Sequence, residues 1–340
     1  MPRFCRHNRF IERCPICRET VPGLQSPERR GLPAIRAGKG GAGTARTRKQ
    51  TRTGRGRDVR VYREGSLRGE DDGYRNELVA GLHGSQDAER LAGEIAFASA
   101  RLQALEIAPP GLYGEIRAQA QRGEGEDEEQ ATWMAFLTAY LSPLQAEDPF
   151  AGIRQALHSD WRGGELPELE DVPLGPRTSH ERSRGAGTLR AYVQWFERAG
   201  SQGAAFRGDD SWSPVRRFER LFERLTLPGF GRMGRYDLLV TLGRLGMYEL
   251  RADSLHLAGI GAATTSSDPT TLAAKRAFGI GDPLILDRRA LALAQALSVP
   301  VEALDLALAN WGAQERASMG MAVDAGDEQA LARARAVLEL

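Results

Sequence analysis

SPVRRFERLFERLTLPGFGRMGRYDLLVTLG, residues 213–243, contains two amphipathic segments joined by a glycine-rich turn. Ser213 is a good helix N-cap, and Pro214 suits the first helical position, where its missing N–H would have no partner anyway. The turn LPGFG follows the order hydrophobic, Pro, Gly, hydrophobic, Gly. This order predicts a helix-hairpin-helix motif.

The glycines of the turn suggest what the motif does. Gly229 and Gly231 permit tight, positive-φ geometry and leave backbone N–H groups uncovered at the start of the second helix. The helix dipole is positive there, so we expect a DNA phosphate to bind without any side chain, with nearby arginines adding charge. The predicted DNA-binding residues are Leu227, Pro228, Gly229, Gly231, Arg232 and Arg235. The alternative is an ordinary turn between two helices with a glycine cap.

Helical periodicity extends over most of the chain after residue 58. The segment NELVAGLHGSQDAERLAGEIAFASARLQALEI has apolar residues at helical spacing, and Ser85 is its expected N-cap. Gly, Pro and Glu dominate residues 160–186, which we expect to form a loop. Further helices are expected over 129–141, 149–157 and 187–200. Since period-2 alternation is nearly absent, the sequence predicts an all-α body at 58–340.

All three cysteines of the chain lie in FCRHNRFIERCPICRE, near the N-terminus. Thiolate and imidazole are preferred ligands of tetrahedral zinc, and the compact spacing favours one shared ion. The predicted ligands are Cys5, His7, Cys14 and Cys17, in a zinc knuckle at residues 1–20. Four protein ligands would close the shell, so the zinc is expected to be structural. The alternative is an accidental cluster at a frayed terminus.

Residues 21–57 are rich in Gly, Arg and Thr, and the part from 26 onward has Glu28 as its only acid. Such a segment repels itself and buries little apolar surface, so we expect a disordered basic linker. It suits an electrostatic arm for nucleic-acid phosphates, and a plain solvated linker is the alternative.

Overall composition is ordinary for a globular protein, with a formal net charge of +1 and 41% hydrophobic residues. No stretch approaches the roughly 20 apolar residues that a membrane helix needs, and the N-terminus has no apolar signal region. These features predict a cytoplasmic protein without a membrane partner.

A candidate catalytic carboxylate, Asp253, follows the hairpin in the sequence. Asp253 lies in YELRADSLHLAG, twenty-two residues after Gly231. This order and spacing resemble the helix-hairpin-helix DNA glycosylase superfamily, in which a catalytic Asp follows the hairpin by roughly twenty residues. Asp287, in LILDRR, is a second candidate, and an ion pair with the adjacent arginines is its alternative role.

A closer resemblance covers most of the chain except the basic linker. The stretches CRHNRFIERCPIC, YRNELVAGLHGSQDAERLAGEIAFASARL and DPTTLAAKRAFGIGDPLILDRRALALAQALSVPVEALDLALANWG resemble the alpha-glutamyl/putrescinyl thymine pyrophosphorylases, in the bacterial branch called clade 3. The resemblance implies a DNA base-modifying enzyme. Its base would carry pyrophosphate on a 5-hydroxymethyl group, and an amine or amino acid would replace the pyrophosphate.

The resemblance also suggests a use for a second glycine turn, KRAFGIGD, fifty residues after the first. Basic side chains and glycine-rich helix starts neutralise a phosphoryl leaving group. The pyrophosphate-binding set would be Lys275, Arg276, Gly279, Gly281 and Arg288. A contact to a second DNA strand and a simple packed turn are the alternatives.

Two other functions compete with base modification. A DNA glycosylase would use the same Asp253 to excise a modified base, although the hairpin offers Arg and not the Lys of a lyase-type enzyme. A non-enzymatic helix-hairpin-helix module would bind double-stranded DNA without chemistry. Such a module needs only about 60 residues, whereas roughly 280 residues here are expected to fold, which favours an enzyme with a pocket.

Overall fold

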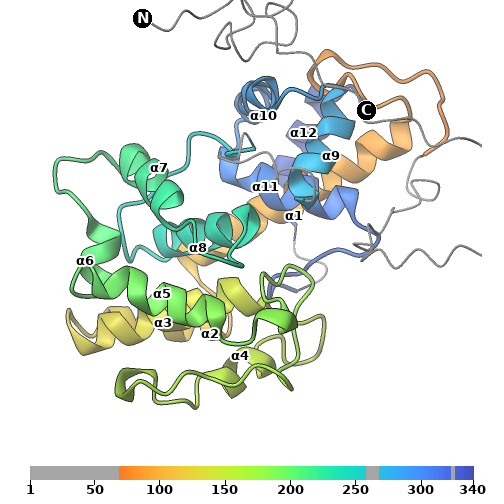
Figure 1. Cartoon of the computed structure of the whole chain (residues 1–340). Coiled ribbons are helices and arrows are strands. Elements are labelled where there is room, and N and C mark those ends of the chain that lie inside the picture. The colour runs from red at the N-terminus through yellow and green to blue at the C-terminus, as the bar shows by residue number, and fades with distance from the viewer. Residues whose placement is uncertain (1–68, 258–267, 323–325) are drawn as a thin grey trace, which may run out of the picture. The chain divides into compact units, whose positions relative to one another are not determined.

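The computed structural model describes residues 69–257, 268–322 and 326–340, which form helices and no strand (Figure 1). The all-α prediction is confirmed for this part of the chain. The described residues belong to one unit, Tyr62–Leu340. The predicted zinc knuckle at 1–20 and basic linker at 21–57 lie outside the described residues.

The α-helices are α1 (Ser85–Ile107), α2 (Leu112–Ala120), α3 (Glu126–Leu141), α4 (Ala151–Ala156), α5 (Gly187–Glu197), α6 (Gln202–Arg207), α7 (Pro214–Arg224), α8 (Arg232–Arg244), α9 (Pro269–Phe278), α10 (Pro283–Leu297), α11 (Val301–Gly312) and α12 (Glu328–Val337). Short 3-10 turns are η2 (Glu77–Val79), η3 (Trp161–Gly163) and η4 (Arg182–Arg184).

The helices α1 and α11 form the centre of one group of helices. All side chains from Val301 to Trp311 are buried, so α11 is enclosed on every side. Its neighbours are α1, α9 and α10, and α12 packs on α1 and α10 (Figure 1). The predicted helix beginning at Ser85 is therefore a central element of the fold.

The helix α3 organises a second group, in which it packs against α2, α4, α6 and α8. Aromatic side chains fill this part of the core, and the rings of Phe136 and Tyr192 stack with centroids 3.6 Å apart. Because α8 packs against α3, α7 and α1, it joins the two groups of helices.

The predicted N-cap of α7 is confirmed, whereas the predicted N-cap of α1 is wrong. Ser213 accepts a hydrogen bond from the Arg216 N–H at 3.3 Å, and Pro214 opens α7, as predicted. Ser85 is wrong as an N-cap, because the cap of α1 is Gly84. The Ser85 hydroxyl and N–H instead donate to the carboxylate of Asp72, which performs the capping from a distant position.

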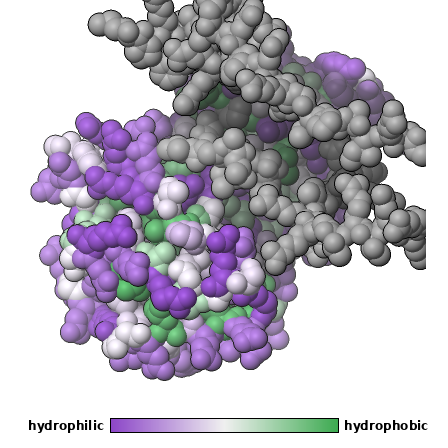
Figure 2. All heavy atoms as spheres, viewed as in Figure 1, coloured by the Kyte–Doolittle hydropathy of each residue, from purple (hydrophilic) through white to green (hydrophobic). Residues whose placement is uncertain are grey.

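The surface facing the viewer in Figure 2 is mostly hydrophilic, with small apolar patches between the polar side chains. Among the described residues, no single helix is long and apolar enough to cross a membrane. Only Leu284–Leu297 and Val301–Gly312 taken together meet the length and composition, and they are bent by 108° at their break.

Candidate active site

The predicted hairpin is present between α7 and α8. Gly229 has φ +80°, as expected, and an added Cβ would lie 2.4 Å from Thr188 Oγ1. The Thr188 hydroxyl donates to the carbonyl of Pro228 at 2.8 Å, which holds the turn against α5. The expected positive φ is wrong for Gly231, which has extended backbone with φ −70° and ψ −179°. Gly229 alone therefore requires the left-handed conformation.

The tip of the hairpin is open to solvent. Pro228 and Gly231 are exposed, and Leu227 is half-buried. Gly231 caps α8 without a side chain, and an added Cβ there would meet no atom within 4 Å. Within the described residues, the Gly231 N–H has no hydrogen-bond acceptor. The start of α8 thus has the open, positive character that suits a phosphate.

Arg235 stabilises the hairpin from within. Its guanidinium donates to the Phe222 carbonyl at 2.8 Å and to Thr226 Oγ1 at 3.0 Å, so it links α8 to the end of α7. It also stacks on the Phe222 ring, 4.3 Å from the centroid. Burial, and secondarily the charge of Arg232, lower the pKa of Arg235 to about 10. The side chain is still charged at neutral pH.

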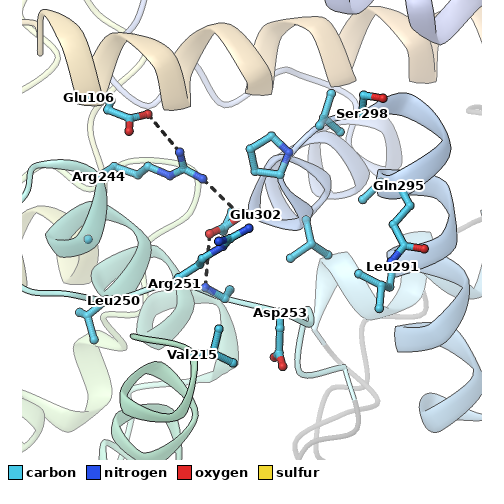
Figure 3. Close-up of a pocket in the computed structure, with 16 residues that line it drawn as sticks. Glu106, Val215, Arg244, Leu250, Arg251, Asp253, Leu291, Gln295, Ser298 and Glu302 are labelled. Carbon is cyan, nitrogen blue, oxygen red and sulfur yellow. Dashed lines mark hydrogen bonds and ion pairs between the residues drawn. The ribbon is translucent and has the colours of Figure 1, made fainter. Parts of the chain in front are cut away.

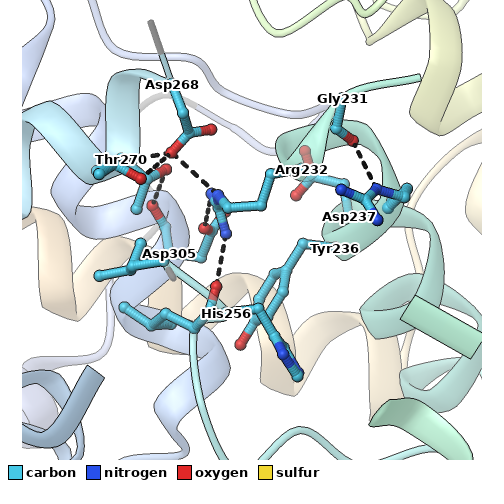
Figure 4. A network of polar contacts seen from close by, with 12 residues as sticks. Gly231, Arg232, Tyr236, Asp237, His256, Asp268, Thr270 and Asp305 are labelled. Carbon is cyan, nitrogen blue, oxygen red and sulfur yellow. Dashed lines mark hydrogen bonds and ion pairs between the residues drawn. The ribbon is translucent and has the colours of Figure 1, made fainter. Parts of the chain in front are cut away.

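Arg232 lies inside the protein and does not reach the hairpin surface (Figure 4). Its guanidinium donates to Asp268 at 3.0 Å, to Asp305 at 2.5 Å and to the Leu255 carbonyl at 2.8 Å. These contacts tie the first residue of α8 to α9, α11 and the loop that follows Asp253. A phosphate at the hairpin would therefore meet backbone N–H groups and not this arginine.

Asp305 is the centre of this buried ionic network. It also accepts a hydrogen bond from Arg177 at 2.7 Å, and Arg177 donates to Asp237 at 3.0 Å. Burial alone would raise the pKa of Asp305, but the two arginines outweigh it and hold the pKa below the ordinary value. The network joins the 160–186 region to α8, α9 and α11.

Asp253 is exposed and lines a cavity of about 750 Å³. Residues of α7, α8, α10 and α11 complete the walls, so the cavity lies where the two helix groups meet (Figure 3). Among the described residues, no hydrogen bond or ion pair occupies the Asp253 carboxylate. An unpaired carboxylate on a cavity of this size can accept a proton or stabilise a cation there.

The backbone on both sides of Asp253 is held by charged side chains. Glu302 accepts the Ala252 N–H at 3.3 Å, just before the aspartate. Asp287 accepts the N–H groups of Leu255 and Leu257, each at 3.1 Å, just after it. Of the two candidate carboxylates, Asp287 therefore anchors the loop and Asp253 lines the cavity.

Further polar groups on the cavity come from distant positions. Arg244 pairs with Glu106 at 3.2 Å and with Glu302 at 3.4 Å (Figure 3). Arg251 and Gln295 also line it. None of these residues was predicted from the sequence, and only Arg251 could have been, since it lies two residues before Asp253.

The second glycine turn lines a different cavity, of about 570 Å³. Lys275, Arg276, Gly279 and Gly281 all contribute to its wall, whereas Arg288 is exposed and does not. The two cavities lie at opposite ends of α1, which has 23 residues and at about 1.5 Å per residue spans roughly 35 Å. The structure thus keeps Lys275, Arg276, Gly279 and Gly281 apart from Asp253.

Within the described ranges, no group of three or more His, Cys, Asp or Glu side chains is arranged to hold a metal. The predicted zinc ligands Cys5, His7, Cys14 and Cys17 lie outside those ranges.

Residues 177–318 match the alpha-glutamyl/putrescinyl thymine pyrophosphorylases, clade 3. This region of the chain is similar to that family. The match contains the hairpin, Asp253, the second glycine turn and the network around Asp305. It confirms the family resemblance for the stretch from Asp268 to Gly312, whereas the stretches at 5–17 and 74–102 lie outside the match. By its name, the family comprises pyrophosphorylases of modified thymine, which supports an enzyme. Comparison with curated proteins and with solved structures gave no match.

Proposed function

We propose that this protein modifies a thymine-derived base in DNA, replacing a pyrophosphate on its 5-methylene group with an amine or amino acid. The observation that carries the proposal is the unpaired carboxylate of Asp253 on a base-sized cavity, inside the region that matches the family. A cavity of about 750 Å³ lies within the usual range of ligand pockets and accommodates an extruded nucleotide.

The proposed step is a substitution at the 5-methylene carbon. The neutral amine attacks this carbon, a C–N bond forms, and the C–O bond breaks with its electron pair leaving on pyrophosphate. The new ammonium then transfers one proton to the Asp253 carboxylate. Arg251 lines the same cavity and would offset the charge of the departing pyrophosphate.

In this proposal Glu302 and Asp287 are positioning residues. They hold the backbone before and after Asp253 and do not touch the substrate. Arg244 holds Glu302 in place through their ion pair. The catalytic carboxylate thereby keeps its place on the wall while the base enters and leaves.

DNA would bind through the first hairpin, with a backbone phosphate at the Gly231 end of α8. The basic segment 21–57 would add non-specific attraction, and the Cys5, His7, Cys14 and Cys17 set would hold a structural zinc. The zinc content of purified protein and the salt dependence of DNA binding after deletion of 21–57 test these two assignments.

The deciding experiment uses DNA that carries pyrophosphorylated 5-hydroxymethyluracil, with putrescine or glutamate as donor. Nucleoside mass spectrometry of the digested product should show an amine-bearing thymidine. Asp253→Asn should lower turnover by at least about 100-fold with little change in DNA affinity, because proton transfer contributes that much. Asp210→Asn, an exposed carboxylate outside the cavity, is the matched control.

Other products would replace this proposal. Abasic sites in the digest would make the protein a glycosylase that uses the same carboxylate. Unmodified DNA despite tight binding with every donor would support a binding protein without chemistry. Full turnover by Asp253→Asn would remove the role assigned to this residue.

A further inference from the structure

We propose that the second cavity is a separate binding site for a phosphoryl anion, remote from the Asp253 cavity. It lies where the segment from Gly81 to Gly84 meets the turn from Gly279 to Gly281. Anion binding at this cavity does not depend on the proposed base modification.

Two glycine-rich backbones meet directly at this site. The Gly81 N–H donates to the Ala277 carbonyl at 3.0 Å, and a Cβ on Gly81 would lie 1.9 Å from the Arg276 carbonyl oxygen. Only glycine allows this approach. The contact fixes the second turn against the start of α1 and builds the floor of the cavity from backbone.

The second turn leaves backbone donors free. Gly279 adopts the left-handed conformation, with φ 66° and ψ 22°, directly after the last residue of α9. Within the described residues, the N–H groups of Gly279, Ile280 and Gly281 have no hydrogen-bond acceptor. Successive free N–H groups around a left-handed residue form a concavity that binds anions.

Three basic side chains line the same cavity, namely His83, Lys275 and Arg276. Lys275 is the only lysine after position 49, the other two being Lys39 and Lys49. It is half-buried, and no ion pair or hydrogen bond holds it among the described residues. Arg276 is oriented by the Trp311 ring, with its guanidinium carbon 4.8 Å from the centroid.

The two acids on the wall are already engaged. Asp87 pairs with Arg90 at 3.2 Å and accepts the Gly69 N–H at 3.1 Å. Asp71 accepts the Gly73 N–H and lies 3.6 Å from Arg75. The positive charge of Lys275 is therefore left to attract a ligand. A lysine is a compact point charge that commonly binds phosphate.

The expected ligand is a phosphoryl anion, which is either a backbone phosphate of DNA or a free pyrophosphate. Two arms of one experiment distinguish these sources. Calorimetry measures binding of inorganic pyrophosphate, and fluorescence anisotropy measures binding of a 20-base-pair duplex across a salt series. The proteins are the full chain, Lys275→Gln, His83→Gln and Arg122→Gln, an exposed arginine outside both cavities that serves as the control.

A pyrophosphate site predicts that Lys275→Gln weakens pyrophosphate binding at least 10-fold, while Lys275→Arg restores most of it. A DNA-phosphate site predicts that Lys275→Gln lowers the slope of log K against log salt by about 1, the effect of one lost contact. Either result supports the site, provided that Arg122→Gln behaves like the unchanged protein.

Lys275 lies far in the chain from the other two lysines, Lys39 and Lys49, so peptide mapping allows an independent measurement. Pyridoxal phosphate followed by borohydride should label Lys275, and pyrophosphate or duplex DNA should protect it, as read by peptide mass spectrometry. The proposal is overturned if Lys275→Gln and His83→Gln change neither form of binding and neither ligand protects Lys275. Because labelling needs no turnover, this outcome is distinct from a failure of the Asp253 chemistry.

Discussion

At the scale of single residues, His256 shows how burial changes chemistry. It adopts a left-handed backbone with φ 52°, stacks on Phe222 at 4.3 Å, and its Nε2 has no partner in the described part of the protein. Burial, then the charges of Arg232 and Arg235, lower the pKa of His256 to about 4. The imidazole is therefore neutral in the folded protein and unsuited to act as an acid near pH 7.

This lowered pKa predicts a pH dependence of stability. Between about pH 6.5 and 4 the unfolded state binds more protons at His256, so stability falls as pH falls. The loss amounts to at most about 3 kcal/mol, from 1.36 kcal/mol per pKa unit. His256→Asn, which tolerates the left-handed backbone, should lack this part of the loss.

Urea unfolding at pH 4.5 and 7.5 measures the difference in the free energy of unfolding. His158→Asn is the matched control, because His158 is exposed. Equal acid sensitivity of His256→Asn and the unchanged protein would show that other groups cause the pH dependence.

At the scale of elements, the α7–α8 hairpin depends on one residue with a positive φ. Gly229→Ala would strain the backbone and bring a Cβ to 2.4 Å from Thr188 Oγ1. We expect a loss of stability of about 1–2 kcal/mol and at least 10-fold weaker DNA binding, because the turn that presents the start of α8 must shift.

Gly164→Ala separates these two effects. Gly164 has φ +89° with open space around it, so alanine there adds backbone strain outside the hairpin. Anisotropy with duplex DNA, alongside thermal unfolding, compares the variants. DNA affinity that falls equally in both would assign the effect to general destabilisation and not to the hairpin.

At the scale of the whole molecule, Asp305 links segments that are far apart in the chain. Its carboxylate joins Arg177, before α5, to Arg232 at the start of α8, and it is itself on α11. Asp305→Asn would remove the negative charge that the buried guanidinium groups of Arg177 and Arg232 share. The expected loss of stability is about 3–5 kcal/mol, the usual cost of breaking a buried pair.

Chemical denaturation checks this prediction, with Asp171→Asn as an exposed control. A loss below about 1 kcal/mol would mean that water replaces the carboxylate and that the network does not hold the helices together.

Local patterns in the sequence determined helices such as α1, α3, α5 and α7, the hairpin turn, the Pro214 helix start and the position of Asp253 in chain order. Each depends on neighbouring residues, through periodicity, capping and the conformational freedom of Gly229. The family resemblance of residues 177–318 could also be inferred from the sequence, because its motifs are continuous in the chain.

Tertiary structure alone decided what these residues contact. It buried Arg232 against Asp268 and Asp305, made Asp287 an anchor for the Asp253 loop, and placed Lys275 at the far cavity. Glu302 meets the Ala252 N–H across fifty positions, and no local pattern encodes such a distance. The physical reason is that charge pairing and burial depend on which helices pack together, whereas a sequence motif specifies only its own backbone.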